Sequence, residues 1–124
     1  MDEIRRSWLM RLAACLIMPS YLIRPASGQE GPRKVIAVRM VKRKVVSPKG
    51  AIRVNENDVI ELHWKSDEAT ILHLHGYDRK FQVRPGETAT LILKANATGR
   101  FPITSHGWGH GGHGALIHLE VYPR

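Results

Sequence analysis

Apolar and polar residues alternate with a period of two through most of the chain after residue 34. This period places successive side chains on opposite faces of a β-strand, and no helical stripe is visible in the same region. Turn residues such as Pro85 and Gly86 interrupt the alternation roughly every ten residues. Strands are expected at 35–41, 52–54, 59–64, 71–75, 80–83, 88–93, 101–104 and 115–121. Seven or eight short strands with turns between them predict an all-β sandwich.

The N-terminus carries a different pattern, which is typical of a secretory signal. A basic start is followed by an apolar run over 12–23 and then by small residues at 26–28. The run is too short to span a bilayer, which needs about 20 residues. We therefore expect residues 1–28 to be a signal peptide that is cleaved before Gln29. An uncleaved membrane anchor or an amphipathic helix is the alternative.

The signal predicts a single exported domain, residues 29–124, located in the periplasm and without stable membrane insertion after cleavage. Cys15 follows a lipobox-like segment, but Arg11 stands directly before this segment, where an apolar run is expected. We treat Cys15 as part of the signal. Because it is the only cysteine, the exported domain has no thiol and no disulfide.

Basic residues exceed acidic ones by 19 to 11 in the 124-residue chain, a net charge of +8. One local cluster consists of 42–44 with Arg39 and Lys49, and such clusters commonly protect the edge of a sheet. Charge alone would allow nucleic-acid binding. The exported context and the lack of interleaved aromatic residues argue against it. Docking of an acidic partner protein is compatible with this charge.

The histidines are the residues whose spacing indicates a functional site. His73 and His75 lie two positions apart in an expected strand, so both imidazoles can face one site. A second group, His106, His110 and His113, lies in the segment 105–114, half of which is glycine. Glycine lets a backbone fold tightly around a small object. The alternative is a flexible solvated connection whose histidines bind nothing specific.

Imidazole suits copper, zinc and nickel. The exported domain offers no thiolate, and its only thioether, Met40, is distant in sequence, so an all-imidazole site favours Cu(II) or Zn(II). A three-histidine site with an open position could also catalyse hydrolysis or redox chemistry, with Asp78 or Glu120 as the base. We expect His63 to have a surface or packing role and His118 to point away from the core without binding metal.

The order of motifs resembles the cupredoxins, and most closely the small periplasmic cupredoxin-like domain proteins of bacteria. The resemblance covers nearly all of 35–122 and rests on 72–78, 83–88, 99–103, the histidine loop and 115–121. It implies a Greek-key sandwich. It also implies a first copper ligand near the end of a central strand, a position that His73 and His75 match. The pair is also similar to the His-x-His-Gly segment of multicopper oxidases, in which both histidines bind copper.

In blue-copper cupredoxins the remaining ligands are a cysteine, a histidine and often a methionine in the loop between the last two strands. The segment from His106 to His113 matches this loop. Ser105, or His106 if the strand contains a one-residue bulge, stands where the cysteine is expected. The resemblance therefore implies the fold, while the missing thiolate argues against type 1 electron transfer.

Together these observations predict a periplasmic copper-binding protein with a non-blue site at one end of the sandwich, for storage, buffering or delivery. Three or four ligands would engage together from the set His73, His75, His106, His110 and His113. Copper is expected as Cu(II), with zinc as the alternative metal and an acidic redox or copper-handling protein as the partner. A copper or zinc enzyme and a non-metal interaction module remain open.

Three aromatic residues near the histidines receive simpler roles. Trp108 is expected to cover the metal site or to take part in docking. Tyr77 and Phe101 are expected to pack in the core.

Overall fold

The computed structural model describes residues 33–108 and 114–124, all of whose regular structure is β-strand. The predicted signal peptide and its cleavage position lie outside these residues. The nine strands are β1 (Arg33–Val41), β2 (Lys44–Ser47), β3 (Ala51–Asn55), β4 (Val59–Ser66), β5 (Thr70–Leu74), β6 (Arg79–Val83), β7 (Ala89–Lys94), β8 (Gly99–His106) and β9 (Ile117–Tyr122). The described residues contain no helix long and apolar enough to cross a membrane.

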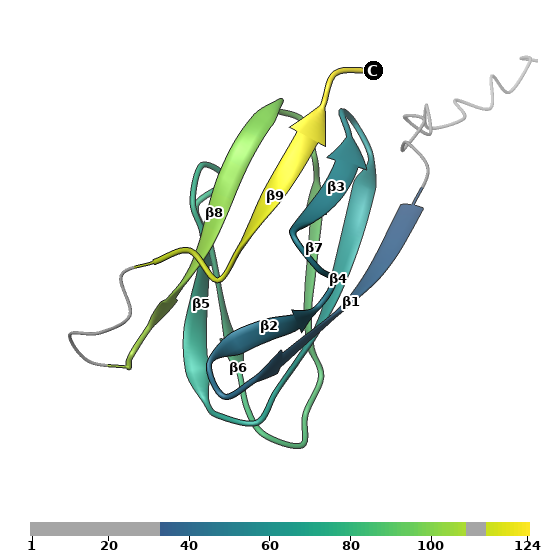
Figure 1. Ribbon diagram of the computed structural model, residues 1–124. Helices are drawn as coiled ribbons and strands as arrows, with labels where there is room; N and C mark the ends of the chain where they lie inside the picture. Colours follow the sequence, from purple (N-terminus) through teal and green to yellow (C-terminus); the bar gives the residue numbers. More distant parts are fainter. Residues whose placement is uncertain (1–32, 109–113) are drawn as a thin grey trace, which may run out of the picture.

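The strands form two sheets that pack face to face, which confirms the predicted sandwich (Figure 1). One sheet has the order β2-β1-β4-β7 and the other β3-β9-β8-β5-β6. The pairs β1–β4 and β3–β9 are parallel, and the other pairs are antiparallel. The described residues form nine strands, one more than the eight expected ranges, and the additional strand is β2. This strand is an edge strand, and Lys44, from the basic cluster, begins it.

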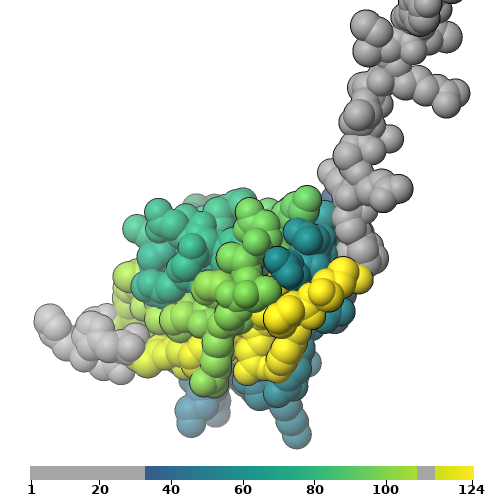
Figure 2. Space-filling view, turned by 90° about the horizontal axis from the view of Figure 1, so that it is seen from above, coloured from purple at the N-terminus to yellow at the C-terminus, as the bar shows by residue number. Residues whose placement is uncertain are grey.

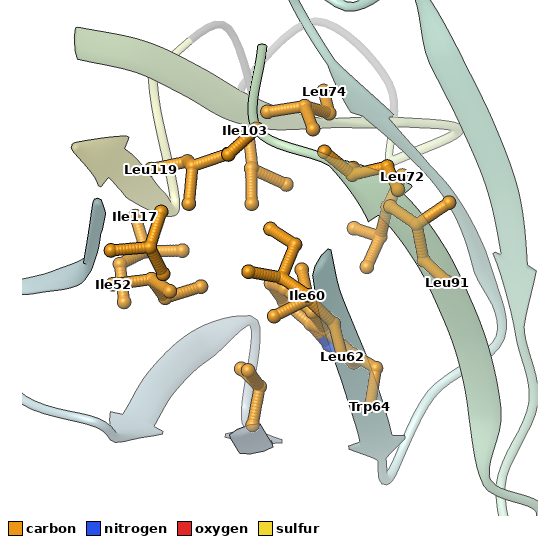
Figure 3. Close-up of a cluster of buried hydrophobic side chains, with 14 of the residues drawn as sticks. Ile52, Ile60, Leu62, Trp64, Leu72, Leu74, Leu91, Ile103, Ile117 and Leu119 are labelled. Atoms are coloured by element: carbon orange, nitrogen blue, oxygen red, sulfur yellow. The ribbon is translucent and has the colours of Figure 1, made fainter. Parts of the chain in front are cut away.

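The alternation of apolar residues produces the core between the sheets. In β4, Ile60, Leu62 and Trp64 are fully buried, whereas Glu61 and His63 between them are only half-buried. Figure 3 shows these side chains meeting those of the opposite sheet. From the end at which β9 finishes, Figure 2 shows a continuous surface of side chains and no open barrel. The buried side chains between the two sheets form a packed core.

The same alternation decides where the histidines of the five-stranded sheet point. Leu72 and Leu74 of β5 and Ile103 of β8 are completely buried in the core. Residues between them, such as His73, consequently face outward. These side chains therefore lie on the outer face of the five-stranded sheet.

Candidate metal site

Three histidines that are far apart in sequence come together on the outer face of β5 and β8. The antiparallel register of these strands places His73 opposite Thr104, and Ile71 opposite His106. His75 directly follows β5, and its backbone N–H continues the ladder by donating to the carbonyl of Pro102 at 3.0 Å. Figure 1 shows β5 and β8 side by side. The pairing of two neighbouring strands is thus sufficient to gather the three imidazoles.

The distances between the three rings suit a single small ion. Nε2 of His106 lies 3.4 Å from Nδ1 of His73. One ligating nitrogen from each of His73, His75 and His106 lies within 4.8 Å of the others. Two nitrogens that are each about 2 Å from one ion can be at most about 4 Å apart. The pair of His73 and His106 meets this limit. The 4.8 Å bound for the whole group is above it, so binding one ion by all three rings requires a movement of side chains.

Two of the rings are held by neighbouring polar side chains. Nε2 of His73 donates to Oδ1 of Asp78 at 3.0 Å. Nε2 of His75 is hydrogen-bonded with Oγ1 of Thr104 at 2.8 Å. Hydrogen bonds of this kind, from the nitrogen that does not bind metal, orient histidine ligands in metal sites.

The surroundings of His75 favour the neutral imidazole. Its pKa is lowered from the ordinary value, first because partial burial penalises the charged ring and then because His73 and His106 add positive charge nearby. A neutral ring has a free lone pair, which is the form that binds metal. The donor set therefore fits a copper or zinc ion, since it offers three imidazole nitrogens and no thiolate.

Ser105 and His106, the two positions that could match the blue-copper cysteine, face opposite sides of the sheet. The hydroxyl of Ser105 lies 2.6 Å from Oγ1 of Thr70, a buried residue. The Thr70 hydroxyl donates to the carbonyl of His106 at 3.1 Å, so the Ser105 hydroxyl is the donor to Thr70. These two hydroxyl groups hold the end of β8 from the inner side while the His106 side chain is exposed on the outer side.

Two of the five candidate ligands, His110 and His113, lie outside the described residues. The two histidines assigned other roles are separate from the cluster. His63 is on β4, in the other sheet, where its Nε2 contacts Oε1 of Glu61 at 2.6 Å. His118 is half-buried on β9, opposite Pro102 of β8.

The aromatic residues near the histidines pack elsewhere. Tyr77 and Phe101 are half-buried against the core and contact each other edge to face, with ring centroids 4.9 Å apart. Trp108 also packs against the core, and the guanidinium of Arg43 lies 5.2 Å from its ring centroid. This contact ties Trp108 to the β1–β2 turn. The expectation that Trp108 covers the metal site has no support in these contacts.

The acidic residues proposed as bases differ in their positions. Asp78 is next to the cluster. Glu120 accepts hydrogen bonds from Tyr122 and Arg53 and forms a second ion pair with Arg100, on the β8–β9 side of the sheet. Thr104 was not recognised from the sequence. The one signal for it was its place in β8, two residues before His106 on the same face.

A cavity of about 330 Å³ lies away from the histidines. It is at the end of β1 and β4, beside the β6–β7 turn, and residues such as Met40, Ser66 and Thr88 line it. No histidine is among its lining residues. The cavity and the histidine group are therefore separate features of the described residues.

Comparison with known proteins supports the fold. No protein family and no curated protein matches the sequence. Among solved structures, the periplasmic domain of subunit II of cytochrome oxidase (CoxB) of Bradyrhizobium japonicum is 16% identical, with a TM-score of 0.57, over 73% of this chain and 84% of that one. A heme-copper terminal oxidase is 20% identical, with a TM-score of 0.56, and a multi-copper oxidase from Pseudomonas Thermotolerans is 17% identical, with a TM-score of 0.58.

These similarities identify the class of domain. The match with the terminal oxidase covers 73% of this chain and 65% of that chain. The match with the multi-copper oxidase covers 76% of this chain and 30% of that chain. The chain has a cupredoxin-like fold. Its outer sheet face carries a three-histidine group, and its single cysteine precedes the described residues.

Proposed function

We propose that this protein is an exported, periplasmic copper-binding protein with a non-blue site. Imidazoles of His73, His75 and His106 would hold Cu(II), and His110 or His113 from the following loop would add a further ligand. The observation that carries the proposal is the convergence of three imidazole nitrogens within 4.8 Å on one sheet face. The periplasmic domain among the similar structures supports the location.

Copper bound by imidazoles alone would supply a Lewis-acidic, exchangeable centre and not a blue electron-transfer centre, which requires a thiolate. The protein residues would bind the ion and keep it from non-specific surfaces. Zinc fits the same three nitrogens and is the alternative metal.

The location of the site favours delivery or buffering over long-term storage. Buried Leu72 and Leu74 lie on the inner side of the site, so the cluster is on the outer face of the sheet. His106 is exposed, and a ligand from another molecule could approach it directly. Lys80 lies opposite His73 on the edge strand β6. A basic edge of this kind suits a copper-handling partner with an acidic surface.

Equilibrium dialysis of the exported domain against Cu(II) and Zn(II) tests the proposal. A peptide with the scrambled sequence of 105–114 is the control, because any histidine-rich segment binds these metals weakly. We expect tighter Cu(II) binding by the protein than by the peptide. A His110→Ala/His113→Ala variant should bind more weakly than the unsubstituted domain, with one nitrogen fewer around copper in electron paramagnetic resonance (EPR) spectra. Equal binding by protein and peptide would refute a built site.

One observation favours an enzymatic role as the second candidate. The carboxylate of Asp78 is next to an outward-facing three-histidine group and could act as a base toward a ligand on the metal. Such an enzyme would catalyse a saturable reaction that a chelator abolishes. No turnover across a panel of redox and hydrolytic substrates with the copper-loaded and zinc-loaded protein would argue against it.

A further inference from the structure

The hydrogen bond between His73 and Asp78 determines which nitrogen of His73 is available to a metal. An ionised carboxylate can only accept hydrogen bonds. The 3.0 Å contact with Oδ1 of Asp78 therefore requires the hydrogen of the neutral His73 ring to be on Nε2. Nδ1 then has the free lone pair, and this atom lies 3.4 Å from Nε2 of His106.

We propose that Asp78 is a positioning residue that selects Nδ1 of His73 as the metal-ligating atom and holds the ring in the ligating orientation. The inference rests on the proposed copper-binding function of the His73, His75 and His106 cluster. It assigns a role to a residue that is 90% exposed at its side chain, beside a His73 side chain that is only 14% exposed.

The β5–β6 turn is shaped to bring Asp78 back onto His73. Gly76 has a φ of +87° and Asp78 has a φ of +49°, so the turn depends on two residues in the left-handed region. A Cβ atom on Gly76 would collide with the ring of Phe101. The ring of Phe101 in turn packs against Tyr77. This packing lies under the backbone of the turn that carries Asp78.

The second polar contact in the cluster lacks this selectivity. The Thr104 hydroxyl can donate or accept a hydrogen bond, so it is compatible with either tautomer of His75. Asp78 is therefore the residue among these contacts whose chemistry imposes a particular tautomer.

Two substitutions separate the hydrogen bond from the charge. Asp78→Gly removes the acceptor, and Asp78→Asn keeps an acceptor oxygen but removes the charge. Glycine and asparagine both tolerate a positive φ, so neither variant should strain the turn. We expect Asp78→Gly to weaken Cu(II) binding by about tenfold, since loss of an outer partner of a histidine ligand costs 10- to 100-fold. Asp78→Asn should retain most of the affinity.

Pulsed EPR of the copper form tests the positioning role of Asp78 directly, because a purely structural role of Asp78 would leave its signal unchanged. The quadrupole coupling of the remote imidazole nitrogen responds to its hydrogen bond, so the signal of one histidine should shift in Asp78→Gly and be largely restored in Asp78→Asn. Glu87→Gln, which removes an exposed negative charge in the β6–β7 turn, is the control and should leave affinity and signal unchanged.

The outcomes distinguish this inference from the proposed function. Unchanged affinity and remote-nitrogen signal in Asp78→Gly, with copper bound by the unsubstituted protein, would overturn the role of Asp78 alone. Loss of a directly bound oxygen ligand in both Asp78 variants would also overturn it, because Asp78 would then bind the metal itself. Absence of copper binding by the unsubstituted protein would refute both.

Discussion

Ser105 and His106 are consecutive residues of β8, yet their side chains face opposite sides of the five-stranded sheet. The Ser105 hydroxyl is directed inward to Thr70, while the His106 ring is directed outward to His73. Of the two positions that could match the blue-copper cysteine, His106 is therefore part of the histidine cluster, and Ser105 faces the other side of the sheet. The outward face of this sheet carries the three-histidine group, and Ser105 takes no part in it.

This separation predicts opposite results for two cysteine substitutions. His106→Cys should place a thiolate on the same face as His73 and His75, and its copper form should show intense thiolate-to-copper charge-transfer absorption. Ser105→Cys should leave the absorption of the copper form weak, as in the unsubstituted protein, because its thiol would face the interior. Visible absorption spectroscopy of both copper forms checks this. An intense band in Ser105→Cys and none in His106→Cys would show that the faces are assigned the wrong way round.

Two glycines with positive φ should differ in their tolerance of alanine. A side chain in the left-handed region costs about 1–2 kcal/mol, and this applies to both Gly76 (φ +87°) and Gly86 (φ +77°). Only at Gly76 would the new Cβ also meet the ring of Phe101, whereas nothing lies within 4 Å of the corresponding position at Gly86.

Gly76→Ala should therefore lower the free energy of unfolding by about 1 kcal/mol or more beyond the loss in Gly86→Ala, since overpacking typically costs about 1–3 kcal/mol. Denaturant unfolding of the two variants measures the difference. Equal losses would mean that Phe101 does not pack under the turn that carries Asp78.

Glu120 should contribute stability that depends on pH. Its pKa is lowered from the ordinary value, first because the Tyr122 hydroxyl donates to it and then because Arg53 and Arg100 carry positive charge nearby. A carboxyl whose pKa is lower in the folded state stabilises the fold above its unfolded pKa, and this contribution is lost as the pH falls through the folded value.

Glu120→Gln should accordingly reduce the unfolding midpoint near neutral pH, and the two proteins should converge as the pH falls below the ordinary carboxyl range. Thermal unfolding followed by circular dichroism at both pH values tests this. A gap between variant and unsubstituted protein that stays the same in acid would rule out the ionised carboxylate as its cause.

Copper release should depend on the incoming ligand. Because the proposed site lies on the outer face of the sheet, we expect that a chelator can bind the metal before the histidines leave. The observed transfer rate should therefore rise in proportion to chelator concentration. Stopped-flow transfer to a coloured copper chelator measures this dependence. A rate that is independent of chelator concentration would indicate a closed site that must first open.

The fold was predictable because the period-two pattern is strong in its central strands. In β4 the apolar residues Ile60, Leu62 and Trp64 alternate with polar ones, and this alternation defines the inward face. Strand β2 was missed because it has only four residues, begins with a lysine and lies at a sheet edge, where propensity is weak.

The candidate site was only partly predictable. The His-x-His spacing showed that His73 and His75 share a face, but the addition of His106 depends on the β5–β8 register, which the local pattern does not encode. The contact of Asp78 with His73 depends on a turn built from two residues with positive φ. The same register places the three histidines on the outer face of the five-stranded sheet.

The most direct test of the central claim is a Cu(II) competition titration of the His73→Ala/His75→Ala/His106→Ala variant beside the unsubstituted protein. A His63→Ala/His118→Ala variant is the matched control, because these histidines lie outside the cluster. We predict that the triple variant loses more than about 100-fold in affinity, more than the loss of an outer partner costs, while the control binds as tightly as the unsubstituted protein. Unchanged Cu(II) affinity in the triple variant would contradict the account.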